Sequence, residues 1–175
     1  MTRPTQVAFI VLIFADGVLL ALWRDGSWSL ERLLAMAPAL LLLLVASAAI
    51  HLANESADHE TDRLTTRTAF SGGSGALQAS GLSPGVPLAA SLGLSAIVIA
   101  GALLAVGAGL ISDLAGALLL LGLAGGLGYS LPPIAAQRRG WGEPLNAVLG
   151  ALLLPLFGVA AMAGAVGPSD AIAFL

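Results

Sequence analysis

The densest group of candidate ligand residues follows an apolar run and lies between His51 and Arg63. Within it, Asn54, Asp58 and Asp62 recur every four residues. On an α-helix each step of four advances about 40° around the axis, so the three side chains share one face over a rise of roughly 12 Å. Oxygen ligands on one face suit Mg²⁺, which is usually held by one or two carboxylates together with waters and phosphate oxygens. The spacing therefore indicates a Mg²⁺–diphosphate site at a membrane surface.

Outside this group the chain is almost entirely apolar. Of its 175 residues, 58% are hydrophobic and 10% are charged, and the mean hydropathy is +0.96. A soluble domain carries about 25% charged residues, so the composition predicts an integral protein of the lipid bilayer. The chain has no cysteine, which excludes disulfides and thiolate metal sites. Its formal net charge of −3 argues against a nucleic-acid partner.

Five apolar stretches are long enough to cross a hydrocarbon core of about 30 Å, which takes about 20 residues. Each is predicted to be a helix, because backbone groups in lipid must be hydrogen-bonded within their own segment. The predicted fold is one all-α transmembrane domain over residues 1–175. The predicted spans are Thr5–Trp23, Leu30–Ala53, Pro87–Ala108, Leu110–Tyr129 and Pro144–Val166.

The arginines predict how the helices are oriented. With a cytosolic N-terminus, five of the seven arginines lie in cytosolic segments and two lie outside, which satisfies the positive-inside rule. Both long polar loops, residues 54–87 and 130–143, are then cytosolic and can share a site. The predicted location is the cytoplasmic membrane. The cytosolic set is Arg3, Arg63, Arg67, Arg138 and Arg139, and the outer set is Arg24 and Arg32.

Two motifs resemble those of a known family. The run Asn54-x-x-x-Asp58-x-x-x-Asp62, followed by Gly72-Gly73-Ser74, is similar to the first Asp-rich motif of the UbiA superfamily of intramembrane prenyltransferases, with the menaquinone-type branch favoured. The run Tyr129-Ser130-Leu131-Pro132-Pro133, followed by Arg139-Gly140-Trp141-Gly142-Glu143, resembles the signature after that family's fourth helix. The resemblance covers the whole chain and implies the front part of a nine-helix fold.

The resemblance implies Mg²⁺-dependent transfer of a prenyl group from a polyprenyl diphosphate donor to an aromatic, quinone-precursor-like or other lipid-precursor acceptor. Carried over residue by residue, Asn54, Asp58 and Asp62 would bind Mg²⁺ and through it the diphosphate. Breaking the C–O bond develops negative charge on the leaving diphosphate, and metal ions and arginines stabilise that charge.

Further roles follow from the same resemblance. Arg63, Arg67 and Arg139 are the guanidinium groups suited to bidentate contact with phosphate. Tyr129, at the membrane end of the fourth span, would place its aromatic ring near the allylic cation. As plainer interpretations, the arginines could contact anionic lipid headgroups and Tyr129 could be an interfacial anchor.

The sequence departs from the family pattern in two places. The second Asp-rich motif is missing, because Asp113 and Asp170 have no acidic partner at suitable spacing. The basic and aromatic residues expected between Pro-Pro and Arg-Gly are replaced by residues 134–138, Ile-Ala-Ala-Gln-Arg. A sixth helix is also expected to begin near Pro168. The expectation is a fragment, or a subunit that needs a complementary C-terminal half.

Other interpretations stay open. The chain could be a non-enzymatic membrane protein such as a subunit of a divalent-cation transporter, although transporters place such carboxylates near the bilayer midplane. His51, Glu55 and His59 also repeat every four residues and could bind Zn²⁺. Asp16 lies within the first span and is expected near a polar interior of the bundle.

Overall fold

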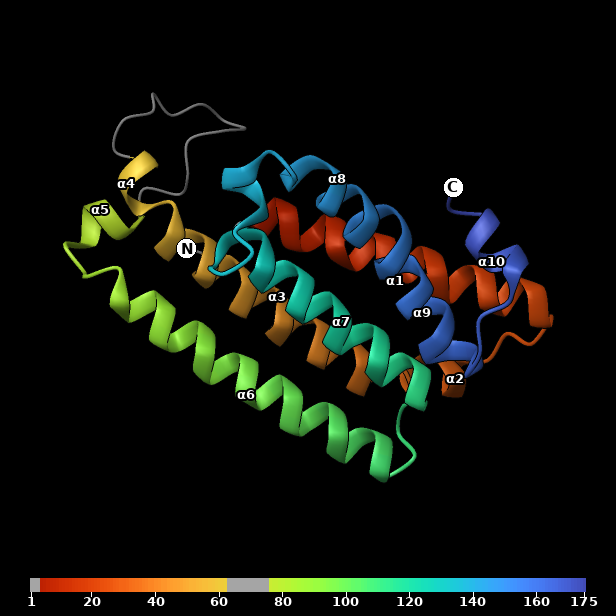
Figure 1. Ribbon diagram of the computed structural model, residues 1–175. Coiled ribbons are helices and arrows are strands. Elements are labelled where there is room, and N and C mark those ends of the chain that lie inside the picture. Colours follow the sequence, from red (N-terminus) through yellow and green to blue (C-terminus); the bar gives the residue numbers. More distant parts are fainter. Residues whose placement is uncertain (1–3, 63–75) are drawn as a thin grey trace.

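The computed structural model describes residues 4–62 and 76–175, and in these residues every regular element is a helix (Figure 1). Five helical stretches are long and apolar enough to cross a membrane. The predicted all-α, multi-spanning bundle is thus confirmed. The five stretches are Pro4–Asp25, Leu30–Ala57, Gly85–Gly107, Asp113–Ser130 and Gly142–Ala163.

Three of the stretches are single helices, and several short helices lie between the stretches or at their ends. The single helices are α1 (Pro4–Asp25), α6 (Gly85–Gly107) and α7 (Asp113–Ser130). Ser112 caps α7, since its hydroxyl accepts a hydrogen bond of 3.1 Å from the backbone N–H of Ala115. The short helices are α4 (His59–Asp62), α5 (Ala76–Ser80), η1 (Ala136–Arg139) and α10 (Pro168–Ile172).

The second stretch is divided into α2 (Leu30–Leu34) and α3 (Ala37–Ala57). Pro38, near the start of α3, has no N–H to donate to the carbonyl of Leu34, and its ring would clash with that carbonyl in a continuous helix. The predicted single span from Leu30 therefore breaks one turn after it begins.

The last stretch stays continuous although it also contains a proline. It consists of α8 (Gly142–Ala147), a π-helical segment η2 (Val148–Leu153) and α9 (Leu154–Ala163). Pro155 cannot bond to the carbonyl of Ala151. The wider π turns just before Pro155 accommodate the proline, so the helix is not ended.

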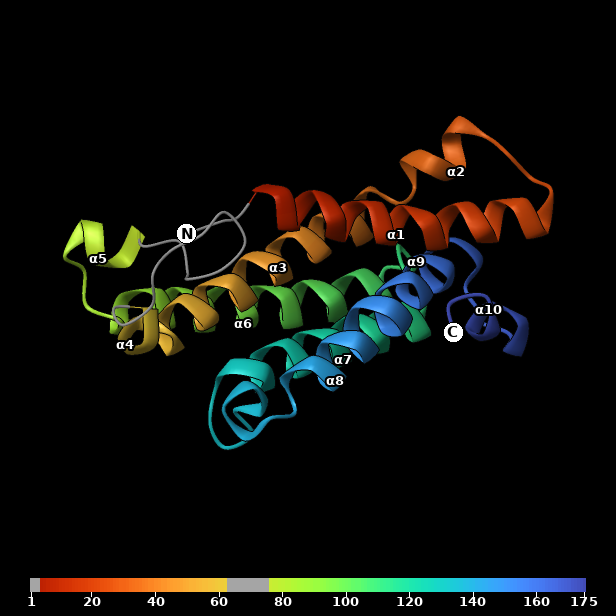
Figure 2. The ribbon, with the colours of Figure 1, turned by 90° about the horizontal axis from the view of Figure 1, so that it is seen from above.

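The five stretches pack so that an interior space forms between α1 and α3. Helix α1 runs along α9 and α3 runs along α6, while α7 contacts α3, α6 and α9 (Figures 1 and 2). In contrast, α1 and α3 touch each other only slightly. The interior is thus walled by α1, α3, α7 and α9. Large buried side chains of the core include Leu22, Val98, Leu119, Phe157 and Val159.

Small residues set the close approach of α1 and α9. A Cβ atom added at Gly17 would collide with the carbonyl oxygen of Pro155, and one added at Gly158 would collide with the carbonyl oxygen of Phe14. Close backbone contact through small residues is how helices associate in lipid, where burial of apolar surface gives little driving force.

This contact gives a prediction for stability. Gly17→Ala should lower the free energy of unfolding by about 2 kcal/mol, because the new methyl group must push the backbones of α1 and α9 apart. Gly93→Ala is the matched control, since a Cβ at Gly93 of α6 meets nothing within 4 Å. Unfolding of both variants in mixed detergent micelles measures the difference, and equal stabilities would contradict the close packing of α1 on α9.

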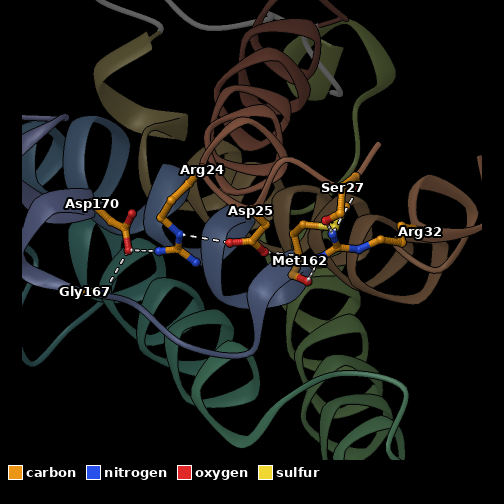
Figure 3. Close-up of polar contacts among 7 residues, drawn as sticks. All are labelled: Arg24, Asp25, Ser27, Arg32, Met162, Gly167 and Asp170. Atoms are coloured by element: carbon orange, nitrogen blue, oxygen red, sulfur yellow. Dashed lines mark hydrogen bonds and ion pairs between the residues drawn. The ribbon is translucent and has the colours of Figure 1, made fainter. Parts of the chain in front are cut away.

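A cluster of charged residues holds α10 at the end of α1 (Figure 3). Asp170 is only 2% exposed, and one of its oxygens accepts hydrogen bonds from Arg24 at 2.6 Å and from the backbone N–H of Gly167 at 2.7 Å. Arg24 also pairs with Asp25 at 3.2 Å, and Asp25 pairs with Arg32 at 3.4 Å. The segment expected to begin a sixth helix therefore forms one short helix that is tied back to α1.

Asp16 does not lie where the sequence analysis placed it. The expectation of a polar bundle interior is wrong, because Asp16 is exposed on α1. The buried face of α1 carries Phe14, Val18, Ala21 and Leu22. Asp16 lies roughly opposite that face, since neighbouring helical positions are about 100° apart.

Candidate functional site

A half-open cavity of about 600 Å³ lies between the helices of the bundle. Its walls are mostly apolar side chains from α3, α7 and the last stretch, and residues at the start of α1 close one side. Polar residues gather where α3 and α7 end. The polar lining residues include His51, Asn54, Asp58, Tyr129, Ser130, Gln137 and Asn146, and the apolar ones include Leu43, Ile50, Leu119, Leu123, Leu149 and Phe157.

The cavity extends along the helix axes. Leu43 and Asn54 both line it, and eleven residues of α3 separate them, which corresponds to a rise of about 16 Å. On α7, Leu118 and Ser130 span a similar length. One polar end and a deep apolar body suit a ligand with a polar head and a hydrocarbon tail.

The two polar segments predicted to share a site meet at the polar end of the cavity. The hydroxyl of Ser130 donates a hydrogen bond of 2.9 Å to the side-chain oxygen of Asn54. The side-chain amide of Gln137 donates one of 2.6 Å to a carboxylate oxygen of Asp58. These contacts join α3 to α7 and η1, and they orient both oxygen-bearing side chains beside the cavity.

The backbone after α7 places Gln137 in this position. Helix α7 ends at Ser130, just before Pro132 and Pro133, whose peptide bond is cis. Ala135 then adopts a left-handed conformation with φ 43°, and η1 begins at the next residue. This turn brings η1 back over the end of α3.

The end of α3 is also held by an arginine. Arg138 donates a hydrogen bond of 2.6 Å to the carbonyl oxygen of Ala57, the last residue of α3. Carbonyls in the last turn of a helix have no partner within the helix, and cationic side chains are favourable there. Arg138 therefore contributes to the position of Asp58, the residue that follows.

Tyr129 lines the cavity and is half-buried. Gly142, at the start of α8, lies against it, since an added Cβ would be 3.1 Å from the Tyr129 ring and 3.0 Å from the Cα atom of Gln137. The close packing here leaves little room for a side chain at this position of the second motif. Arg139 of the same motif is exposed and does not line the cavity in the structure. Its role in phosphate binding stays a prediction.

The acidic motif is only partly within the described residues. Helix α3 ends at Ala57, Asp58 forms a turn, and α4 begins at His59, so the expected continuous helix is interrupted at Asp58. Asp62 is the last residue of α4, and its side chain lies outside the described part, as do Arg63 and Arg67.

The oxygen donors fit Mg²⁺ better than Zn²⁺. Asn54 and Asp58 offer amide and carboxylate oxygens at the cavity end, and Mg²⁺ accepts a few such ligands when waters and phosphate oxygens complete its shell. Among the described residues, no group of three histidine or carboxylate side chains converges as a metal site. A zinc site at His51, Glu55 and His59 stays an untested alternative.

Five polar lining residues were not assigned roles from the sequence: Gln6, Ser47, Ser130, Gln137 and Asn146. Gln137 lies in the segment that departs from the family pattern, and Ser130 was noted only as part of a motif. Asn146 is the only polar side chain in the predicted span Pro144–Val166. A lone polar residue in an apolar span usually faces the bundle interior, so Asn146 could have been assigned to the cavity from the sequence.

Comparisons with family models, with curated proteins and with solved structures found no match to this chain.

Proposed function

We propose that the protein is an intramembrane prenyltransferase of the UbiA type. It would transfer a prenyl group from a polyprenyl diphosphate to an aromatic, quinone-precursor-like or other lipid-precursor acceptor, with Mg²⁺. The observation that carries the proposal is the meeting of the two motifs at one cavity end, where Asn54 and Asp58 bond to Ser130 and Gln137 beside Tyr129. The apolar body of the cavity matches the hydrocarbon chain of the donor.

In the proposed reaction the allylic C–O bond of the donor breaks and its electron pair leaves with the diphosphate. A carbon of the acceptor forms the new C–C bond to the allylic centre and then loses a proton. Mg²⁺, when bound, neutralises charge on the diphosphate oxygens. Asn54 and Asp58 would supply oxygen ligands for it, and the Tyr129 ring would provide a negative π face for the developing cation.

Residues beyond these keep the roles implied by the resemblance. Asp62 would add a third oxygen ligand, and Arg63, Arg67 and Arg139 would contact phosphate. Asp58 is the only carboxylate among the cavity-lining residues of the described part. This supports a further element of the proposal, that a complementary half bearing the second acidic motif completes the metal site.

The arginine positions support a cytosolic site in the cytoplasmic membrane. Arg138 and Arg139 lie at the end of the bundle that carries Asp58, and Arg24 and Arg32 lie at the opposite end (Figures 1 and 3). With the five-to-two distribution of arginines, the N-terminus and the polar end of the cavity would face the cytosol.

Binding of the donor tests the proposal. The chain in nanodiscs should bind radiolabelled geranylgeranyl diphosphate in the presence of Mg²⁺, and EDTA should weaken binding at least about tenfold, because Asp58 and the diphosphate repel each other without a cation between them. Geranylgeraniol, which has no diphosphate, is the control and should bind equally with and without EDTA. If EDTA left the affinity for the donor unchanged, the metal-bridged arrangement would be refuted.

A further inference from the structure

The outer face of α1 carries a continuous exposed stripe that no other part of the described chain covers. Its residues are separated by alternating steps of four and three, the seam pattern of two helices packed side by side. The stripe lies opposite the face that packs on α9, and of its members only Phe9, near the start of α1, also borders the cavity. It consists of Thr5, Phe9, Leu12, Asp16, Leu19 and Trp23, of which Phe9, Leu12 and Trp23 are 65%, 63% and 74% exposed.

Asp16 is the charged residue at the centre of this stripe. It lies twelve residues after Pro4 and nine before Asp25, so it is about 18 Å and 14 Å from the two ends of α1. In a membrane crossed by α1 this is close to the middle of the hydrocarbon core. Within the described residues, Asp16 has no hydrogen bond and no ion pair.

A carboxyl group facing lipid at this depth is unfavourable, and intramembrane ionisable residues almost always pair with another polar group. The nearest candidates in this chain cannot reach it. Arg24 and Arg32 are engaged by Asp170 and Asp25 at the far end of α1, and Arg138 is bound to α3.

A second copy of the chain does not supply the missing partner either. The chain has no lysine, and none of its seven arginines, at positions 3, 24, 32, 63, 67, 138 and 139, lies near the middle of one of the five apolar stretches. A parallel copy that packed on the stripe would place two Asp16 side chains against each other. Like charges in that position repel.

We infer that the α1 stripe is the docking surface for a transmembrane helix outside these 175 residues that carries a lysine or arginine near its middle. Leu12 and Leu19 would pack one turn to either side of the ion pair and exclude lipid from it. The inference rests on α1 alone and does not depend on what the cavity binds.

Energy transfer in vesicles tests the inference. The chain, labelled through Leu175→Cys at its exposed end, is reconstituted with an acceptor-labelled peptide, a 24-residue Leu/Ala helix with one central lysine. The reference peptide has leucine in place of the lysine. We expect the lysine peptide to associate about tenfold more tightly than the reference. Asp16→Leu and the isosteric Asp16→Asn should remove most of that preference.

Asp113→Asn is the matched control, because Asp113 is exposed at the start of α7 and lies off the stripe. It should keep the full preference for the lysine peptide. Equal binding of the two peptides, or a preference that survives both Asp16 variants, would overturn the inference. The inference would also be overturned if two labelled copies showed energy transfer without peptide and Asp16→Leu abolished it. A second copy of the chain would then be the occupant of the stripe.

Discussion

Asp58→Ala should reduce prenyl transfer by about 10²-fold or more and remove the Mg²⁺ dependence of donor binding. Asp58 is the one carboxylate that lines the cavity in the described residues, and Gln137 fixes one of its oxygens at 2.6 Å. Loss of a single preorganised electrostatic contact commonly costs a factor of about 10² to 10³ in rate. Transfer of label from geranylgeranyl diphosphate to a panel of aromatic acceptors, with a complementary half present, measures the effect.

Two comparisons make this result specific. Asp113→Ala removes a carboxylate that is exposed outside the cavity, so it should leave transfer unchanged. Gln137→Ala keeps the carboxylate of Asp58 but removes the hydrogen bond that orients it. This variant should weaken transfer less than Asp58→Ala does. If Asp58→Ala and Asp113→Ala behaved alike, Asp58 would have no role at the reacting diphosphate.

Arg24→Ala should destabilise the fold by about 3 kcal/mol. Asp170 is 2% exposed, and Arg24 is its charged partner. The substitution therefore leaves a buried carboxylate with only the Gly167 N–H as a donor. Removing one member of a buried ion pair typically costs several kcal/mol, because the other charge stays desolvated. Thermal unfolding in detergent, followed by tryptophan fluorescence, measures the loss.

The neighbouring Asp25 provides the control for this prediction. Asp25 pairs with both Arg24 and Arg32, but its side chain is 31% exposed and water can replace its partners. Asp25→Asn should therefore leave the unfolding temperature nearly unchanged. In an Asp170→Ala background, Arg24→Ala should cost much less than in the native chain. Equal losses in both backgrounds would show that the pair contributes nothing.

The spans of the bundle could be predicted because length and hydropathy determine them. The predicted span Thr5–Trp23 differs from α1 by only one or two residues at each end. The break before α3 was missed, although Pro38 stands in the sequence as its cause. The buried face of α1 could not be predicted, because apolar residues surround the whole helix and the buried side depends on the close packing against α9 at Gly17 and Gly158.

The site was predicted in part for a similar reason. Spacing on one helix brought Asn54 and Asp58 together, and both line the cavity with Tyr129. The partners of these side chains depend on how the chain turns between α7 and α8. The left-handed Ala135 and the contact of Gly142 with Tyr129 are properties of the folded loop, so the pairing of Gln137 with Asp58 had no signal in the sequence.

Photolabelling of the cavity tests the central proposal most directly. A farnesyl diphosphate analogue with a diazirine at the end of its isoprenoid chain should bind with its diphosphate at Asn54 and Asp58. Its tail should then label the deep wall near Leu43, Leu119 and Phe157. Labelling should require Mg²⁺ and disappear with excess unlabelled geranylgeranyl diphosphate. Label confined to outward-facing residues such as Leu103 and Leu104, or unaffected by the competitor, would contradict the proposed function.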